Sequence, residues 1–318
     1  MNLIEEAVII ELFGIRMYAF GVYVTLGALL AVAVFAIAGR NLSMKAGSVP
    51  LTVLLSSVCG ILMSRICFCL MNRELGGITP LSYWPQLNGG GWSMVGLICG
   101  VFLGGYISAK ITGEKAGRIL DLLSLSILPL MAAERIGESR IEDFDISRPL
   151  DSTFLSGSFL ALGEDEPVLA TYYIAAATAI VLFTVLVFRF SRREREGNLT
   201  IAFLLMYGAS SIITESLRYD RFLSISFVGL QQVSAAIILA LGVFLAVKRS
   251  NRPKSFLASA AMISIPLTIC IVISLEFALD RTTWNKILIY TAMIIAVCIP
   301  AGMGLKLLNI SRKGNEAV

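Results

Sequence analysis

The chain has 318 residues, of which 57% are hydrophobic and only 15% are charged, and its formal net charge is +4. Its mean hydropathy is +0.81. A water-soluble globule of this size cannot hide so many apolar side chains, so these values exclude a soluble fold and indicate that the solvent is a bilayer. The chain contains no histidine, which removes the usual neutral-pH general base and the commonest metal ligand.

Apolar runs of roughly 17 to 22 residues recur along the chain, the length that a helix needs to cross a hydrocarbon core of about 30 Å. They predict an all-α, polytopic integral membrane protein with about nine transmembrane helices. In chain order the predicted spans are 18–37, 50–70, 92–109, 119–133, 169–188, 199–213, 228–247, 256–275 and 287–305. Little sequence remains for a soluble domain.

Basic residues gather in alternate connections between the predicted spans. By the positive-inside rule these connections are cytoplasmic, which places the N-terminus outside and the C-terminus inside a plasma membrane that the chain crosses many times. The opposite connections are 72–91, with tryptophan, tyrosine and glycines, and 138–167, which is rich in acidic residues. The basic residues that set this orientation include Arg40, Lys45, Lys110, Lys115, Arg118, Arg189, Arg192, Arg193, Arg195, Lys248, Arg249, Lys254 and Lys306.

A few charged residues lie within or at the ends of the predicted spans. A charge at mid-bilayer costs about 3 kcal/mol even on the most lenient scale, so such residues face the bundle interior and have a partner or a function. At 3.6 residues per turn, several of them fall near one face of the fourth span, and others line one stripe of the sixth. The charged residues are Arg65, Asp121, Glu134, Arg135, Glu138, Glu215 and Arg218, and Tyr207 and Ser211 share the stripe of the sixth span.

Two interpretations of these residues remain open. One is structural: ion pairs, for instance between Arg65 and Glu215, hold helices together. The other is a binding site for the phosphate of an anionic phospholipid, since guanidinium groups offer a planar fork of donors that stays charged when partly desolvated. No metal, no cofactor and no nucleic-acid partner is expected, because neither a metal-ligand cluster nor a nucleotide-binding motif is present.

Short motifs run from the first predicted span to the seventh. Arg135-Ile136-Gly137 follows Asp121 and precedes Arg148-Pro149-Leu150-Asp151, and Tyr207-Gly208 precedes Glu215 and Arg218. Further motifs include Tyr18, Arg65, the run 90–96, Tyr172 and the segment 231–234. Over about residues 10–248 this set resembles the prolipoprotein diacylglyceryl transferase family.

The resemblance implies a fold and an activity. Members of that family move a diacylglyceryl group from phosphatidylglycerol to the cysteine thiol of a lipobox, forming a thioether and releasing glycerol phosphate. The chain is then expected to hold a seven-helix transferase-like core in residues 1–250 and an additional two-helix segment in residues 251–318. Its expected partners are phosphatidylglycerol, the lipobox peptide of a prolipoprotein and membrane lipids.

The resemblance also assigns roles to residues. Arg135, together with Arg140, Arg218 and Arg65, is expected to bind the phosphate of phosphatidylglycerol. Catalytic roles are expected for Glu138, Tyr18 and Glu215. Cationic donors in these positions would stabilise the charge that builds on a departing phosphate.

Three positions depart from the family pattern. Val95 stands where the family has a histidine, Glu138 replaces an asparagine, and Ser211 replaces an arginine. The first hypothesis is an active transferase in which Glu138 or the leaving phosphate accepts the proton. A membrane protein that binds an anionic lipid or lipopeptide without turnover is the alternative. A membrane transporter is a third possibility, against which stands the lack of an obvious internal repeat.

Overall fold

A computed structural model of the chain describes residues 8–12, 15–71, 91–140, 161–162, 168–218, 224–225, 228–250, 254–282 and 284–316. The motif at 148–151 and most of the connection 72–91 lie outside these ranges. In the described part, nine helices are long and apolar enough to cross a membrane, which confirms the all-α, polytopic fold. They are α1 (Ala19–Asn41), α2 (Ser48–Met71), α3 (Met94–Thr112), α4 (Ala116–Gly137), α5 (Thr171–Ser191), α6 (Asn198–Ser216), α7 (Leu230–Arg249), α8 (Phe256–Arg281) and α9 (Lys286–Glu316).

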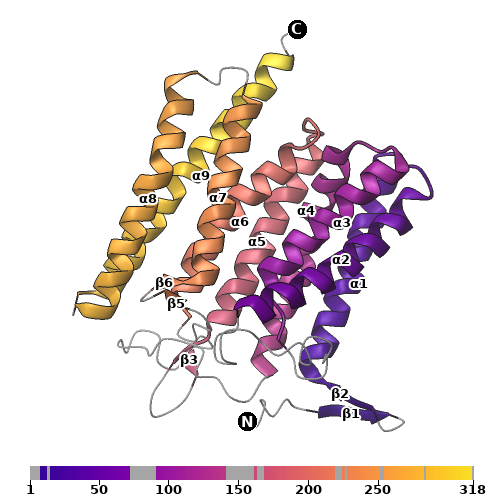
Figure 1. The fold of residues 1–318 in the computed structure, drawn as a ribbon, viewed down its shortest axis with the longest axis horizontal. Coiled ribbons are helices and arrows are strands. Elements are labelled where there is room, and N and C mark those ends of the chain that lie inside the picture. The colour runs from indigo at the N-terminus through magenta and orange to yellow at the C-terminus, as the bar shows by residue number, and fades with distance from the viewer. Residues whose placement is uncertain are drawn as a thin grey trace. The chain divides into compact units, whose positions relative to one another are not determined.

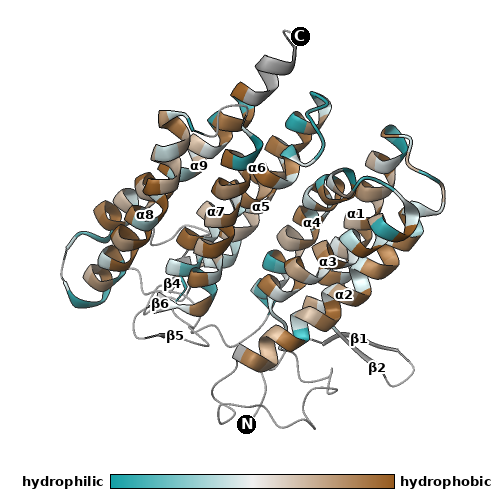
Figure 2. Ribbon diagram, turned by 45° about the horizontal axis from the view of Figure 1, so that its top comes forward, coloured by the Kyte–Doolittle hydropathy of each residue, from teal (hydrophilic) through white to brown (hydrophobic). Residues whose placement is uncertain are grey.

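All nine described helices end later than predicted, whereas α1, α3, α5 and α7 also begin one or two residues later than predicted. α4 starts three residues earlier than predicted and ends four residues later, and α9 continues well past the predicted end at residue 305. Backbone groups in an apolar solvent must pair within the helix, and Lys and Arg can reach the interface from the last turns. Figure 2 shows this pattern, with apolar colour along the helices and hydrophilic colour at several of the turns that join them.

Short antiparallel strand pairs accompany the helices, and the sequence did not predict them. β1 (Val8–Leu12) pairs with β2 (Ile15–Tyr18), β3 (Ala161–Leu162) with β4 (Val168–Leu169), and β5 (Ser224–Ile225) with β6 (Val228–Gly229). The first pair ends at Tyr18, whose partner in the register is Val8 and which is also the N-cap residue of α1. A single-turn helix, η3 (Glu138–Arg140), follows α4.

The chain divides into two compact units, and Figure 1 labels the helices that make them up. Unit 1 comprises Met1–Val185 with Leu217–Asp220, and unit 2 comprises Leu186–Ser216 with Arg221–Val318. In unit 1, α2 packs on α3, and α4 packs on α1 and α3. In unit 2, α6 packs on α7 and α9, and α8 packs on α9. The expected boundary at residue 250 stays a prediction.

Glycines bring α2 and α3 into backbone contact. Gly96, Gly100 and Gly104 recur every four residues on one side of α3, and a Cβ on any of them would overlap a backbone oxygen of α2. Small residues at this spacing let two membrane helices approach closely, so that van der Waals contact and weak C–H···O bonds hold them. The backbone of α2, which carries Arg65, is thereby held against α3.

The basic connections gather at one end within each unit. In unit 1 the Lys45 ammonium donates to the carbonyl of Thr112 at 2.9 Å, and the Lys45 amide donates to Glu114 at 3.0 Å. These bonds join the α1–α2 turn to the α3–α4 turn. In unit 2 the Arg249 guanidinium donates to the carbonyl of Glu196, which joins the end of α7 to the α5–α6 turn. The protein is thus a multi-pass membrane protein with paired basic turns.

Candidate functional site

The candidate site begins where α4 leaves the bundle. More of α4 and α6 is buried than of any other span in the described chain, as expected of helices that carry polar stripes. The end of α4 lies against α1, because a Cβ on Gly137 would stand 3.0 Å from that of Tyr23, and a Cβ on Gly27 2.7 Å from that of Ala133. This close packing fixes the direction in which the last turn of α4 presents its charged side chains.

Four charged side chains form one cluster at this end of α4, and we call Glu134, Arg135, Glu138 and Arg218 the Glu138 cluster. Arg135 Nη1 lies 2.7 Å from Glu138 Oε1, and Arg218 Nη1 lies 3.4 Å from the same oxygen. Arg135 Nε lies 3.3 Å from Glu134 Oε2. Three residues that the sequence singled out, Arg135, Glu138 and Arg218, are therefore brought together.

The cluster is shielded from solvent without being sealed from it. The side chains of Arg135, Glu138 and Arg218 are 15%, 12% and 13% exposed. The two guanidinium groups and the two carboxylates balance in formal charge, and their mutual attraction offsets the free-energy cost of removing them from water. Each guanidinium presents five N–H donors in a planar fork, the geometry that suits carboxylate and phosphate oxygens alike.

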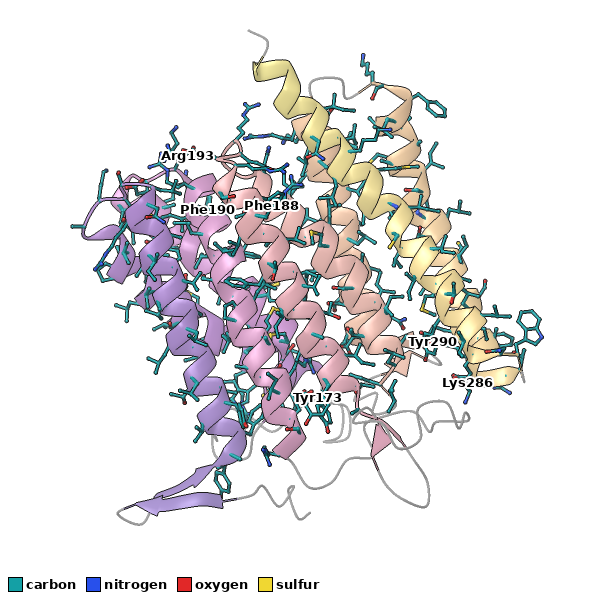
Figure 3. The ribbon with its side chains drawn as sticks, turned by 180° about the vertical axis from the view of Figure 1, so that it is seen from behind. Tyr173, Phe188, Phe190, Arg193, Lys286 and Tyr290 are labelled. Atoms are coloured by element: carbon teal, nitrogen blue, oxygen red, sulfur yellow. The ribbon has the colours of Figure 1, made fainter. Side chains whose placement is uncertain are left out.

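Arg140 adds an accessible cation near the cluster. It ends η3, its side chain is exposed, and its charge lies within electrostatic range of the Tyr172 hydroxyl at the start of α5. Tyr172 is buried and meets Tyr173 edge to face, with ring centroids 4.4 Å apart. Figure 3 labels Tyr173 at this end of α5. The sequence predicted Arg140 as a phosphate ligand, and the exposure of its side chain leaves it accessible to a ligand.

Arg65 contacts the segment that enters α3. Its side chain is buried, its Nη1 donates to the carbonyl of Gly91 at 2.8 Å, and its guanidinium carbon lies 5.7 Å and 5.8 Å from the ring centroids of Phe68 and Trp92. Arg65 therefore fastens the segment that enters α3. Sequence reasoning missed this contact, although Gly91 and Trp92 stood in a recognised motif, and a phosphate-binding role for Arg65 stays a prediction.

The other predicted site residues occupy the ends of helices. Tyr18 precedes α1 and is 40% exposed, and Glu215 lies in the last turn of α6 with its side chain half-buried. Val95, at the position of the family histidine, lies in the first turn of α3 and is also half-buried. Their catalytic or binding roles stay predictions, since nothing in their described contacts identifies a substrate.

A known protein family matches a stretch of the chain that includes both arginines of the Glu138 cluster. The family model described as prolipoprotein diacylglyceryl transferase matches residues 7–248, which is more than half of the chain and includes α1 to α7 almost entirely. A search of curated proteins finds no match. The family match and the membrane-spanning helices agree with the resemblance carried by the motifs. The chain therefore belongs to the prolipoprotein diacylglyceryl transferase family.

Proposed function

We propose that the chain transfers a diacylglyceryl group from phosphatidylglycerol to the cysteine thiol of a lipobox peptide, at the outer side of a plasma membrane. The observation that supports this most is the convergence of Arg135 and Arg218 on one oxygen of Glu138, at 2.7 Å and 3.4 Å. A phosphate is a better partner for two such groups than one carboxylate oxygen, because it offers several charged acceptors at once.

The reaction balances with the groups that the site supplies. The thiol sulfur attacks the glyceryl carbon that bears the phosphate, a C–S bond forms, and the C–O bond to the phosphate breaks. Glycerol phosphate leaves with the electron pair of that bond. The thiol proton passes to the carboxylate of Glu138 or to the departing phosphate, since the chain has no histidine to receive it.

In the proposed mechanism, the arginines contribute most of the stabilisation of the transition state. Arg135, Arg140 and Arg218 hold the phosphate and stabilise the negative charge that grows on it as the C–O bond breaks. Tyr18 and Glu215 are proposed to shape the pocket that holds the lipid, and Arg65 is proposed to support this pocket from α2. The proposed orientation of the chain in the membrane places the N-terminus outside and the basic turns in the cytoplasm.

The test is labelling of a lipobox peptide in vesicles that contain the purified protein and phosphatidylglycerol. The wild type is expected to form a thioether-linked product, and R135A is expected to form it about 100-fold more slowly, because one donor to the developing charge is lost. R118A is the control, since Arg118 lies in the first turn of α4, at the opposite end of that helix, and pairs with Glu114 of the preceding turn. A folded wild type that yields no product would rule out the proposal.

Binding without turnover is a second candidate, favoured by one observation. Val95 occupies the family histidine's position, and no histidine elsewhere in the chain can replace it. In that case the Glu138 cluster would still retain phosphatidylglycerol, and R135A would abolish retention, while the peptide would stay unlabelled and the chain would not replace an active family member in cells.

A further inference from the structure

The last two helices lie outside the family match, yet they are bonded to a helix within it. The family model ends at residue 248, before α8 and α9 begin. In unit 2, α9 packs on α6 and α7, and α8 packs on α7 and α9. Two of the hydrogen bonds among these helices reach carbonyls in the last turns of α6, those of Ile212 and Ser216, on either side of Glu215.

Tyr290 of α9 closes the end of α6. Its hydroxyl donates to the carbonyl of Ser216, the final residue of that helix, at 3.2 Å. The last four carbonyls of a helix have no partner within it, and Ser216 is 0% exposed, so bulk water does not reach its carbonyl. The Tyr290 hydroxyl therefore supplies a cap from a segment 74 residues further along the chain. Figure 3 labels Tyr290 close to the start of α9, one turn beyond Lys286.

A buried side-chain amide and a buried carboxyl group, those of Gln232 and Glu276, hold α6 one turn before Ser216. Gln232 Nε2 of α7 donates to the carbonyl of Ile212 at 3.3 Å and to Glu276 Oε1 of α8 at 2.8 Å. Glu276 is 0% exposed and Gln232 is 3% exposed. Burying a carboxyl group among apolar helices costs free energy unless the group is hydrogen-bonded, as Glu276 is to Gln232. Glu276 thereby orients the side-chain amide of Gln232, and this amide in turn binds the carbonyl of Ile212 in α6.

We propose that Tyr290 and the Gln232–Glu276 pair are positioning residues for the transferase site. They hold Ile212 and Ser216, which flank Glu215 in the same turn, and the chain reaches Arg218 two residues after Ser216. The additional helices are then a brace for the part of α6 that delivers Glu215 and leads to Arg218. This role rests on the proposed function, but its structural half can be measured without it.

The structural half is tested by hydrogen exchange on the full-length protein in phosphatidylglycerol nanodiscs. Y290F removes one hydroxyl and nothing else, and it is expected to speed amide exchange in residues 212–218 about tenfold, because the last turn of α6 opens more often. E276L is expected to do the same. Y106F is the matched control, since Tyr106 is exposed on α3 and the substitution keeps the ring over which the Lys110 ammonium lies. Unchanged exchange in residues 212–218 in both variants overturns the proposal.

The functional half is tested by kinetics with the same variants. Y290F is expected to raise the KM for phosphatidylglycerol several-fold and leave the KM for the lipobox peptide unchanged, which a general loss of stability would not do. Faster exchange with wild-type kinetics in Y290F overturns the positioning role. A wild type without product contradicts the proposed function alone, and the exchange measurement still decides whether Tyr290 and Glu276 hold α6.

Discussion

At the scale of single residues, the central feature is one carboxylate oxygen with two guanidinium partners. Arg135 reaches Glu138 from the preceding turn of α4, whereas Arg218 is 80 positions further along the chain. The helical period places Arg135 and Glu138 on one face, so their pairing could be predicted. The contact with Arg218 could not, because nothing local in the sequence determines which residues meet across 80 positions.

The first residue-scale prediction concerns Glu138. In the proposed site the carboxylate competes with the lipid phosphate for Arg135 and Arg218, so E138Q is expected to bind phosphatidylglycerol about fivefold more tightly while forming product more slowly. Lipid retention after detergent washing, read by mass spectrometry, measures this. E114Q is the control, because Glu114 pairs with Arg118 and Lys45 instead. Equal retention in E138Q and E114Q would contradict competition.

The second residue-scale prediction concerns Arg65. R65K keeps the charge but loses the planar fork that reaches the carbonyl of Gly91 and lies near the rings of Phe68 and Trp92. Since the side chain is buried, the substitution is expected to lower the free energy of unfolding by about 1–3 kcal/mol. Unfolding in mixed micelles measures the loss, and an R65K midpoint equal to that of the wild type would show that the contact contributes nothing.

At the scale of elements, the helices followed from their composition and the connections did not. A run of about 20 apolar residues has to be helical in lipid, so each span could be predicted. The ends could not, because polar residues continue a helix into the interface. Glu276 shows the consequence: it lies one residue beyond the predicted span 256–275, yet it is wholly buried within α8. The β1–β2 pair before α1 also went unpredicted.

The element-scale prediction tests the glycines of α3. In G100A the new methyl group would overlap the backbone of α2 at Cys59, so the helices have to separate, and the free energy of unfolding is expected to fall by about 1–3 kcal/mol. G302A is the matched control, because a Cβ on Gly302 of α9 meets nothing within 4 Å. Similar unfolding midpoints for both variants would show that the α2–α3 contact is not sterically limited.

At the scale of the whole molecule, paired basic turns predict how the chain is inserted. The α1–α2 and α3–α4 turns are bonded together in unit 1, and the α5–α6 turn is bonded to the end of α7 in unit 2. The alternation of basic and non-basic connections could be predicted from the sequence. Which turns would be linked could not be predicted, because those bonds depend on how helices pack.

The whole-molecule prediction concerns topology. Alkaline phosphatase, which is active only outside the cytoplasm, is expected to be inactive when fused to the C-terminus and active when fused after Thr282, between α8 and α9. The reason is that basic turns stay on the cytoplasmic side of the membrane. Activity at the C-terminus and none after Thr282 would invert the orientation.

The carboxylate of Glu138 has a consequence for the end of the proposed reaction. The product, glycerol phosphate, carries more negative charge than the phosphodiester from which it came, and a pocket lined only with arginines would retain it. In this cluster Glu138 stands within reach of the same two guanidinium groups and can reclaim them as the phosphate departs. In the proposed reaction, an internal anion of this kind is expected to speed product release, so that tight capture of the donor lipid need not slow turnover.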